Sequence, residues 1–172
     1  IVTKGSTLSC VVKDVLKHYR ENPGIREGDG FLCNDPYIGI MHQNDVALVM
    51  PFFYEGELVA WVGAEIHQID VGGPTPGQVQ LGAKDIYGEA PLMPPIKIVQ
   101  DGVLLADVER NYLRKSRVPD LLALDLRAKL AACNTLISNL NSLASKLSKT
   151  GLTDFLEDIL NDAERLLRAK LR

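Results

Sequence analysis

The chain has 172 residues, of which 24% are charged and 46% hydrophobic, and its formal net charge is -3. This length suffices for a domain with its own core, while the slightly negative charge argues against a nucleic-acid or anionic-membrane surface. Because no apolar run approaches the ~20 residues of a membrane span, we expect neither nucleic acid nor a membrane among its partners.

The cysteines and the amino-terminal segment bear on where the protein works. Cys10, Cys33 and Cys133 lie far apart and match no metal-ligand spacing, which is typical of free thiols in a reducing compartment. Polar residues interrupt every apolar run in the first twenty residues, whereas a secretory signal contains a continuous apolar region. We therefore expect a cytoplasmic protein. Because the chain opens on Ile1 instead of methionine, we also expect a processed or partial product.

A helix and a short strand are predicted first. Apolar residues recur at helical spacing over residues 6–20, and the Asn22-Pro23-Gly24 sequence ends that pattern. His18 lies on or near the polar face of this helix, so we expect it to be solvated. Residues 30–33 are predicted to form a short strand.

Two hairpins are predicted next. Apolar, partly β-branched runs at 46–54 and 58–66 flank a short connection that contains glycine. The segment 71–91 carries five Gly and three Pro, so we expect a loop there. The runs 97–99 and 103–105 flank an Asp-Gly pair, which is a strong signal for a tight hairpin.

The last third of the chain is predicted to be helical. A continuous pattern over 119–149 places its apolar residues on one stripe, which indicates core or a subunit interface; the stripe consists of Leu126, Leu130, Cys133, Ile137, Leu140, Ala144 and Leu147. Thr150-Gly151 is expected to cap this helix, and Asp154 with Glu157 to start a final one. The final helix is predicted to bury Leu156, Ile159, Leu160, Ala163 and Leu167.

Two similar polar clusters, His42-Gln43-Asn44-Asp45 and His67-Gln68-Ile69-Asp70, lie at the two ends of the first hairpin. A hairpin that leaves from one cluster and returns to the other brings them together. Imidazole and carboxylate are natural ligands for Zn, Mn or Fe, and two histidines with one carboxylate leave coordination positions open, as a catalytic metal requires. The fourth group could orient a ligand imidazole through its other ring nitrogen.

The pattern alone leaves other interpretations open. His-x-x-Asp also occurs by chance, and a capping aspartate or an internally bonded histidine would explain each piece separately. Acid–base catalysis by His42 or His67 with its neighbouring aspartate, without a metal, is a further interpretation. The chain has no GxxxxGK[ST] sequence, so it carries no P-loop nucleotide site of its own.

Together these patterns predict an α+β protein. Its N-terminal part, residues 1–110, would be rich in β-hairpins and hold a loop-rich metal site. Residues 111–172 would form a helical region with a long helix and a final short helix.

Several longer motifs occur in a recognisable order between residues 5 and 135. They are Glu27-Gly28-Asp29-Gly30-Phe31-Leu32, Asn34-Asp35-Pro36-Tyr37, Pro51-Phe52-Phe53, Gly56-Glu57-Leu58, the two His–Asp clusters, Val71-Gly72-Gly73, Thr75-Pro76-Gly77, Pro95-Ile96-Lys97-Ile98-Val99 and Ser116-Arg117-x-Pro119-Asp120. In these motifs the chain resembles the hydantoinase B family. That family includes the B component of N-methylhydantoinase, part of 5-oxoprolinase, and the metal-binding large subunits of acetone and acetophenone carboxylases.

Within that family the chain resembles the ketone carboxylases more closely. Hydantoinase-like members usually read GGTHLPD and AHHAD at the two clusters, whereas this chain reads GIMHQND and IHQID. The resemblance implies that His42, Asp45 and His67 are the catalytic metal ligands. It also makes Asp70 a candidate to orient a ligand and places Asn34 and Asp35 on the approach of the substrate.

The resemblance further implies a division of labour between subunits. A hydantoinase A-type partner, with or without a small third subunit, would use ATP to activate the ketone and bicarbonate. The metal site would then carboxylate the activated enolate, with the cation stabilising the enolate oxygen. Family members run to several hundred residues, so the chain is expected to be an internal fragment of the metal-binding subunit.

Two alternatives to a carboxylase remain. The first is a hydrolase of the same family that opens a cyclic amide such as a hydantoin or 5-oxoproline. The second is a non-catalytic assembly module, in which the stripe over 126–147 docks to partner subunits.

Overall fold

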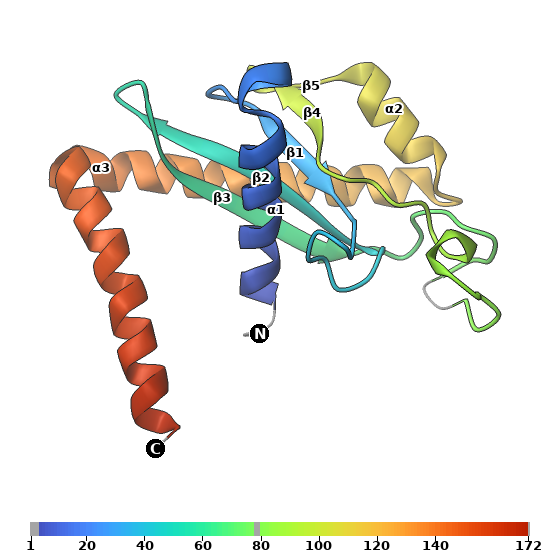
Figure 1. Ribbon diagram of the computed structural model, residues 1–172. Coiled ribbons are helices and arrows are strands. Elements are labelled where there is room, and N and C mark those ends of the chain that lie inside the picture. The colour runs from blue at the N-terminus through green and yellow to red at the C-terminus, as the bar shows by residue number, and fades with distance from the viewer. Residues whose placement is uncertain (1–3, 78–79, 172) are drawn as a thin grey trace.

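A five-stranded antiparallel sheet, with strand order β3-β2-β1-β4-β5, forms the centre of the computed structural model, which describes residues 4–77 and 80–171. Helix α1 (Lys4–His18) crosses one face of the sheet, and the first part of helix α3 (Pro119–Lys170) crosses the other (Figure 1). Helix α2 (Ala106–Arg114) lies beside the end of the sheet and leads into α3. The predicted α+β class and the long carboxy-terminal helix are confirmed.

Both predicted hairpins are present. Strands β2 (Asp45–Tyr54) and β3 (Glu57–His67) pair along their whole length, from Asp45 opposite His67 to Tyr54 opposite Glu57. The turn residues Glu55 and Gly56 have φ of 52° and 79°, the left-handed pair that a two-residue hairpin turn requires. Strands β4 (Ile96–Gln100) and β5 (Val103–Leu104) form the second hairpin, and β1 (Gly30–Cys33) lies between the two.

Alternation along the strands divides the core into two layers. Leu32, Val46 and Leu48 pack with α3, whereas Phe31, Ala47 and Val49 pack with Val11 and Val15 of α1. Successive side chains of a strand point to opposite faces, so neighbouring residues belong to different layers. Nearly every residue of β1 and β2 is buried because both faces of the sheet are covered.

Helix α2 and two single turns were not predicted from the sequence. Helix α2 is rich in charged residues, and its apolar face is small. This face consists of Val108, Tyr112 and Leu113, which pack on the core. The stability of α2 therefore comes from tertiary packing more than from local pattern. Of the two single turns, the first is a turn at Arg20–Gly24, in which Asn22 has a non-helical backbone. The second is a 3-10 turn at Ile86–Gly88, in the otherwise irregular described part of the segment 71–91.

The apolar stripe of α3 is core of this chain. Leu126, Cys133 and Ala144 are fully buried, and Leu130, Ile137 and Leu140 pack against them. Leu147, the last residue of the stripe, is exposed, and the rest of the stripe packs as core on the chain's own sheet.

The break in α3 lies earlier than predicted. Ser148 has φ 63° and ψ 171°, a non-helical conformation, so the first straight section ends there and not at Thr150-Gly151. The Oγ of Ser148 accepts a hydrogen bond of 3.4 Å from the Gly151 N–H, as a residue that caps a helix N-terminus does. Asp154 and Glu157 therefore lie inside the second section instead of starting it.

The predicted burial of the final helix was largely wrong. Leu152 is fully buried and Leu156 half-buried against the far end of the β2–β3 hairpin, where they meet Phe52. Beyond them the helix leaves the sheet (Figure 1), and the remaining predicted residues are exposed, namely Ile159, Leu160, Ala163 and Leu167. The amphipathic pattern is real, but the sheet is too short to cover it.

Within the described residues, every helix lacks the combination of length and hydropathy that crossing a bilayer demands.

A buried lysine connects α3 to the first hairpin. Lys129 is fully buried, and its Nζ donates a hydrogen bond of 3.3 Å to the carbonyl of Val46. Burial lowers the pKa of Lys129 from 10.5 to about 7, although nearby acidic groups, Asp125 foremost, oppose this shift.

Replacing Lys129 by methionine is expected to stabilise the fold at neutral pH by about 1–4 kcal/mol, because a buried polar group gives way to an apolar one of similar shape. Between the folded-state pKa of about 7 and the ordinary value of 10.5, only the unfolded chain binds a proton at this position, so the stability of the parent rises with pH. The gain from Lys129→Met should therefore be largest at pH 7 and shrink towards pH 10 in urea unfolding. The exposed Lys146 on the same helix, replaced in the same way, is the control. A gain that does not change with pH would contradict the lowered pKa.

Candidate metal centre

The hairpin register brings His42, Asp45 and His67 together. Asp45 opens β2 directly opposite His67, which closes β3. His42 lies in the turn before β2, where its carbonyl accepts a 2.9 Å hydrogen bond from the Asp45 N–H. Ligand-type atoms of the three side chains all lie within 4.8 Å of one another. The predicted convergence of the two clusters therefore holds for these three residues.

One buried carboxylate holds both imidazoles. Asp45 Oδ2 lies 3.0 Å from His42 Nδ1, and Asp45 Oδ1 lies 2.7 Å from His67 Nδ1. The Asp45 side chain is 1% exposed, whereas those of His42 and His67 are 65% and 32% exposed. The two rings meet edge to face, with centroids 5.9 Å apart. Two surface imidazoles thus share one buried carboxylate, that of Asp45.

This donor set suits a borderline divalent ion. Two imidazole nitrogens and a carboxylate are the ligands that Zn, Mn and Fe accept. Ligand-type atoms of all three residues lie within 4.8 Å of one another, and the two Asp45 oxygens lie at hydrogen-bond distance, 3.0 Å and 2.7 Å, from the two Nδ1 atoms. The residues therefore fit a divalent ion, and metal binding itself stays a prediction.

The cysteines do not contribute to this cluster. All three are free thiols, as the sequence predicted. Burial raises the pKa of Cys33 to about 12 and that of Cys133 to about 11, so both thiols stay protonated and are poor ligands.

A buried polar layer connects the two ligand-bearing strand ends. The Gln68 N–H donates to the Asn44 carbonyl, and Asn44 Nδ2 donates to the Gln68 carbonyl, each over 2.8 Å. The Tyr112 hydroxyl on α2 then donates to Gln68 Oε1 over 2.5 Å. Sequence reasoning missed these roles, although the amide residues in the two His–Asp clusters were a signal for them.

Asn34 and Asp35 bond to nearby backbone groups, and their place on the substrate approach stays a prediction. Asn34 is buried, its Nδ2 donates to the carbonyls of Gln43 and Pro91, and its Oδ1 accepts from the Met93 N–H. It therefore fixes the turn that carries His42. Asp35 Oδ1 accepts a 2.9 Å bond from the Tyr37 N–H, which forms a local turn.

Asp70 has a different contact from the predicted one. Its Oδ2 accepts a 2.8 Å bond from the Arg117 guanidinium, and its Oδ1 accepts bonds from the N–H groups of Gly72 and Arg117. The described hydrogen bonds of its side chain include neither imidazole. Burial alone would raise the pKa of Asp70, but the hydrogen bonds from Arg117 and Gly72 outweigh burial and lower it.

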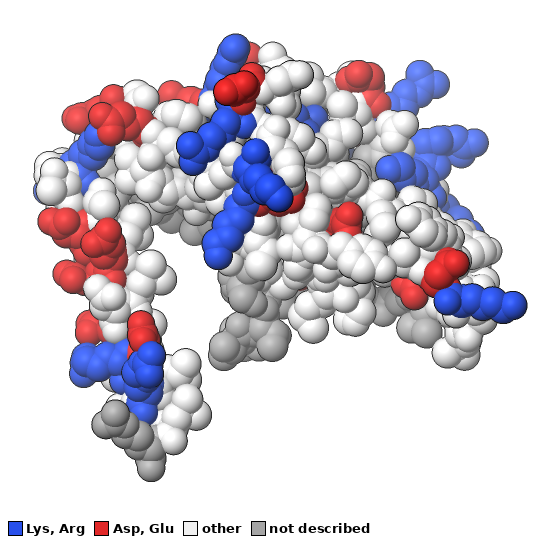
Figure 2. Space-filling view, in the orientation of Figure 1, with Lys and Arg blue, Asp and Glu red and all other residues white. Residues whose placement is uncertain are grey.

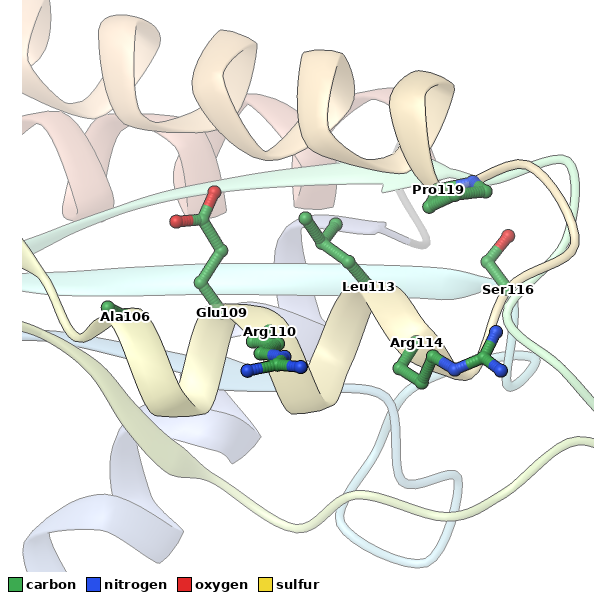
Figure 3. Close-up of a pocket in the computed structure, with 7 residues that line it drawn as sticks. All are labelled: Ala106, Glu109, Arg110, Leu113, Arg114, Ser116 and Pro119. Carbon is green, nitrogen blue, oxygen red and sulfur yellow. The ribbon is translucent and has the colours of Figure 1, made fainter.

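A groove along α2 lies apart from the three ligands. Figure 3 shows its lining, which consists of Ala106, Glu109, Arg110, Leu113, Arg114, Ser116 and Pro119. Basic side chains gather over this helix in the space-filling view (Figure 2). Ser116 connects the groove to the loop after β3, because its Oγ donates a 2.8 Å bond to the Asp70 carbonyl.

Comparison with known proteins shows what the chain is similar to. A family model described as hydantoinase B/oxoprolinase matches residues 2–172. The acetophenone carboxylase delta subunit of Aromatoleum aromaticum is 29% identical over 155 residues, which cover 90% of this chain and 22% of that protein.

Two solved structures resemble the fold. The ATP-dependent caprolactamase of Pseudomonas jessenii aligns with a TM-score of 0.88 and 31% identity over 96% of this chain and 28% of that chain. The nucleotide-free structure of acetone carboxylase aligns with a TM-score of 0.81 and 27% identity over 84% of this chain and 19% of that chain. This chain thus spans about a quarter of the length of these relatives.

Replacing Arg117 by methionine should destabilise the chain by about 1 kcal/mol at pH 7, a figure kept low because the guanidinium is 40% exposed. Because the folded-state pKa of Asp70 is lowered, the charge-dependent part of this loss is fully present above the unfolded-state pKa of about 4. That part should disappear as the pH falls through the lowered pKa. Urea unfolding at pH 7 and pH 3 measures the difference, with Arg165→Met, which removes an ion pair to Asp162 that is exposed on both sides, as the control. An equal loss at both pH values would assign the effect to packing and not to charge.

Proposed function

This chain belongs to the hydantoinase B/oxoprolinase family, and we propose that it forms the metal-site part of an ATP-dependent ketone carboxylase subunit. The convergence of His42, Asp45 and His67 carries this proposal. Members of the family that resemble this chain are subunits of carboxylases and of amide hydrolases. The GIMHQND form of the first cluster favours a carboxylase.

The residues of the chain prepare the site in three ways. Asp45 keeps the Nδ1 atoms of both imidazoles turned towards one carboxylate, His42 towards Oδ2 and His67 towards Oδ1. Its burial places the negative charge in a low-dielectric environment, where its attraction for a cation is strong. The Asn44–Gln68 bonds hold the two strand ends at a fixed separation.

A divalent ion held by His42, Asp45 and His67 would supply Lewis acidity for the oxygen of an activated ketone. His42 is 65% exposed, so the open side of the cluster faces solvent, where ketone and bicarbonate could approach.

ATP chemistry is assigned to a partner in this proposal. The sequence carries no P-loop motif. Two related proteins are described as ATP-dependent, and several are named as subunits of larger enzymes. We therefore propose a hydantoinase A-type ATP-using partner, with or without a small third subunit. The three free thiols support a cytoplasmic location.

Ring opening of a cyclic amide is the second candidate function. The close structural match to a caprolactamase, over 96% of the chain, favours it. The same three ligands would serve, because a Lewis acid also polarises an amide carbonyl.

Metal content tests the shared part of both candidates. In the full-length subunit assembled with its partner, we expect close to one equivalent of Mn, Zn or Fe by elemental analysis, and its loss in His42→Ala, because a three-residue site loses a ligand. His18→Ala is the matched control, since His18 is exposed on α1 and bonds only to Asp14 in the described contacts. Metal-free parent protein with full activity would overturn the metal site and favour acid–base chemistry. A metal content equal in parent and His42→Ala would place the ion elsewhere.

Substrate dependence separates the two candidates. A carboxylase should consume ketone only when bicarbonate and ATP are both present, because bicarbonate supplies the new carboxyl group. A hydrolase should open a cyclic amide with ATP at a rate that bicarbonate does not change. Product analysis by mass spectrometry with ¹³C-bicarbonate tests this directly. Ring opening without incorporation of label would move the assignment to the hydrolase.

A further inference from the structure

Tyr112 connects helix α2 to the strand end that carries His67. The Tyr112 side chain is buried in the α3 layer of the core, and its hydroxyl donates a 2.5 Å hydrogen bond to Gln68 Oε1. Burial raises the pKa of the Tyr112 hydroxyl, so this group stays protonated and remains a donor. The bond therefore joins α2 to the residue that directly follows His67 in the chain.

The Tyr112 hydroxyl is not needed for the packing of α2. The ring belongs to an apolar cluster that includes Val71, Met93 and Leu122, where the ring of a phenylalanine would occupy the same place. A hydroxyl in such a core is costly unless it is hydrogen-bonded. Its described bond goes to Gln68, so the group serves that contact.

The Gln68 side chain depends on this hydroxyl. Gln68 is fully buried, and its N–H and carbonyl bond to Asn44. Within the described residues, the Tyr112 hydroxyl is the sole hydrogen-bond partner of the Gln68 side chain, since Gln68 Nε2 has none. Loss of the hydroxyl would leave both polar atoms of a buried amide unpaired. Gln68 could then reach another partner only by moving.

Movement of Gln68 reaches the imidazole of His67 through the backbone. His67 is the last residue of β3, and the Gln68 N–H extends the pairing with the opposite strand by its bond to the Asn44 carbonyl. Neighbouring side chains of an extended chain point to opposite faces of the sheet. A backbone rotation that moves the Gln68 amide on one face therefore turns the His67 ring on the other, away from its 2.7 Å contact with Asp45.

The junction between α2 and α3 holds the next residues in the same way. Ser116 Oγ donates a 2.8 Å bond to the Asp70 carbonyl, and the Arg117 guanidinium donates a 2.8 Å bond to Asp70 Oδ2. Residues 68–70 are thus attached to α2 and to its junction with α3 by side chains. Among these attachments, the bond from Tyr112 is the one that ends directly beside His67.

We propose that Tyr112 is a positioning residue for His67: through Gln68 it fixes the strand end that carries this imidazole and thereby raises the affinity of the site for a divalent ion. The inference rests on the proposed function, since it takes such an ion as the occupant of the cluster formed by His42, Asp45 and His67.

The test removes the hydroxyl and keeps the ring. Tyr112→Phe is compared with Tyr19→Phe, which also deletes a tyrosine hydroxyl bond, of 2.6 Å to the Pro95 carbonyl, but in the α1 layer of the core. The full-length subunit assembled with its partner is stripped of metal and titrated with Zn²⁺ alone in competition with a chelator. Thermal unfolding and the amide hydrogen exchange of residues 60–70, followed by mass spectrometry, are measured on the metal-free protein.

We expect Tyr112→Phe to bind Zn²⁺ about 10-fold more weakly than the parent, the low end of what loss of a group that orients a ligand histidine costs. Exchange in residues 60–70 should be faster in this variant. Tyr19→Phe should match the parent in both measurements. Both variants lose one hydrogen bond and should show similar falls in thermal midpoint, so only a positioning role predicts a difference in Zn²⁺ affinity.

Gln68→Met removes the acceptor of the same bond and decides the result if Tyr112→Phe does not fold. Because both substitutions break one hydrogen bond, the double variant should bind Zn²⁺ no more weakly than the weaker single variant. Additive losses would contradict a shared pathway through this bond and overturn the inference.

Equal Zn²⁺ affinity in Tyr112→Phe and Tyr19→Phe would overturn the inference, whatever the exchange rates, and leave Tyr112 a structural residue only. A parent that binds no Zn²⁺ would instead count against the proposed function. Hydrogen exchange then decides whether Tyr112 fixes the strand end: faster exchange in Tyr112→Phe alone supports this, and equal exchange in both variants overturns it.

Discussion

The pairing of Asp45 with His67 is the constraint on which the rest of the site depends. These two residues are register partners at the end of the β2–β3 hairpin where His42 also lies. Because side chains alternate across a sheet, a slip by one residue would exchange the two faces of a strand. Asp45 would then exchange places with Val46, which packs in the α3 layer of the core. Burial of the apolar strand residues therefore holds the carboxylate in position for both imidazoles.

This arrangement concentrates polar groups in a buried region, which is costly unless each group is paired. The pairing comes from segments distant in the chain. Asn34 bonds to Gln43 and Met93, Gln68 bonds to Tyr112 on α2, and Asp70 bonds to Arg117. The turn that carries His42, the strand ends and the α2–α3 junction are thus joined by side-chain bonds. Among the described residues, the amide nitrogens of Gln43 and Gln68 both lack a hydrogen-bond partner.

Local chemistry made part of this structure predictable. The Asp101-Gly102 pair and the Gly56 turn select tight hairpins from a few residues, and the repeated His-x-x-Asp spacing indicated that His42, Asp45 and His67 come together. The errors arose where distant contacts decide. Arg117, which pairs with Asp70, lies 47 residues away from it in the chain. The exposure of Ile159 depends on where the sheet ends, and α2 is held by packing of Tyr112. No local sequence pattern indicates which residues far apart in the chain will be in contact.

The ligand set alone does not select a reaction. A carboxylase and an amide hydrolase both resemble this chain over most of its length, with TM-scores of 0.81 and 0.88. A Lewis-acid site of two histidines and an aspartate can polarise a ketone oxygen or an amide oxygen equally well. Selectivity must then come from groups that contact the substrate outside the ligand set.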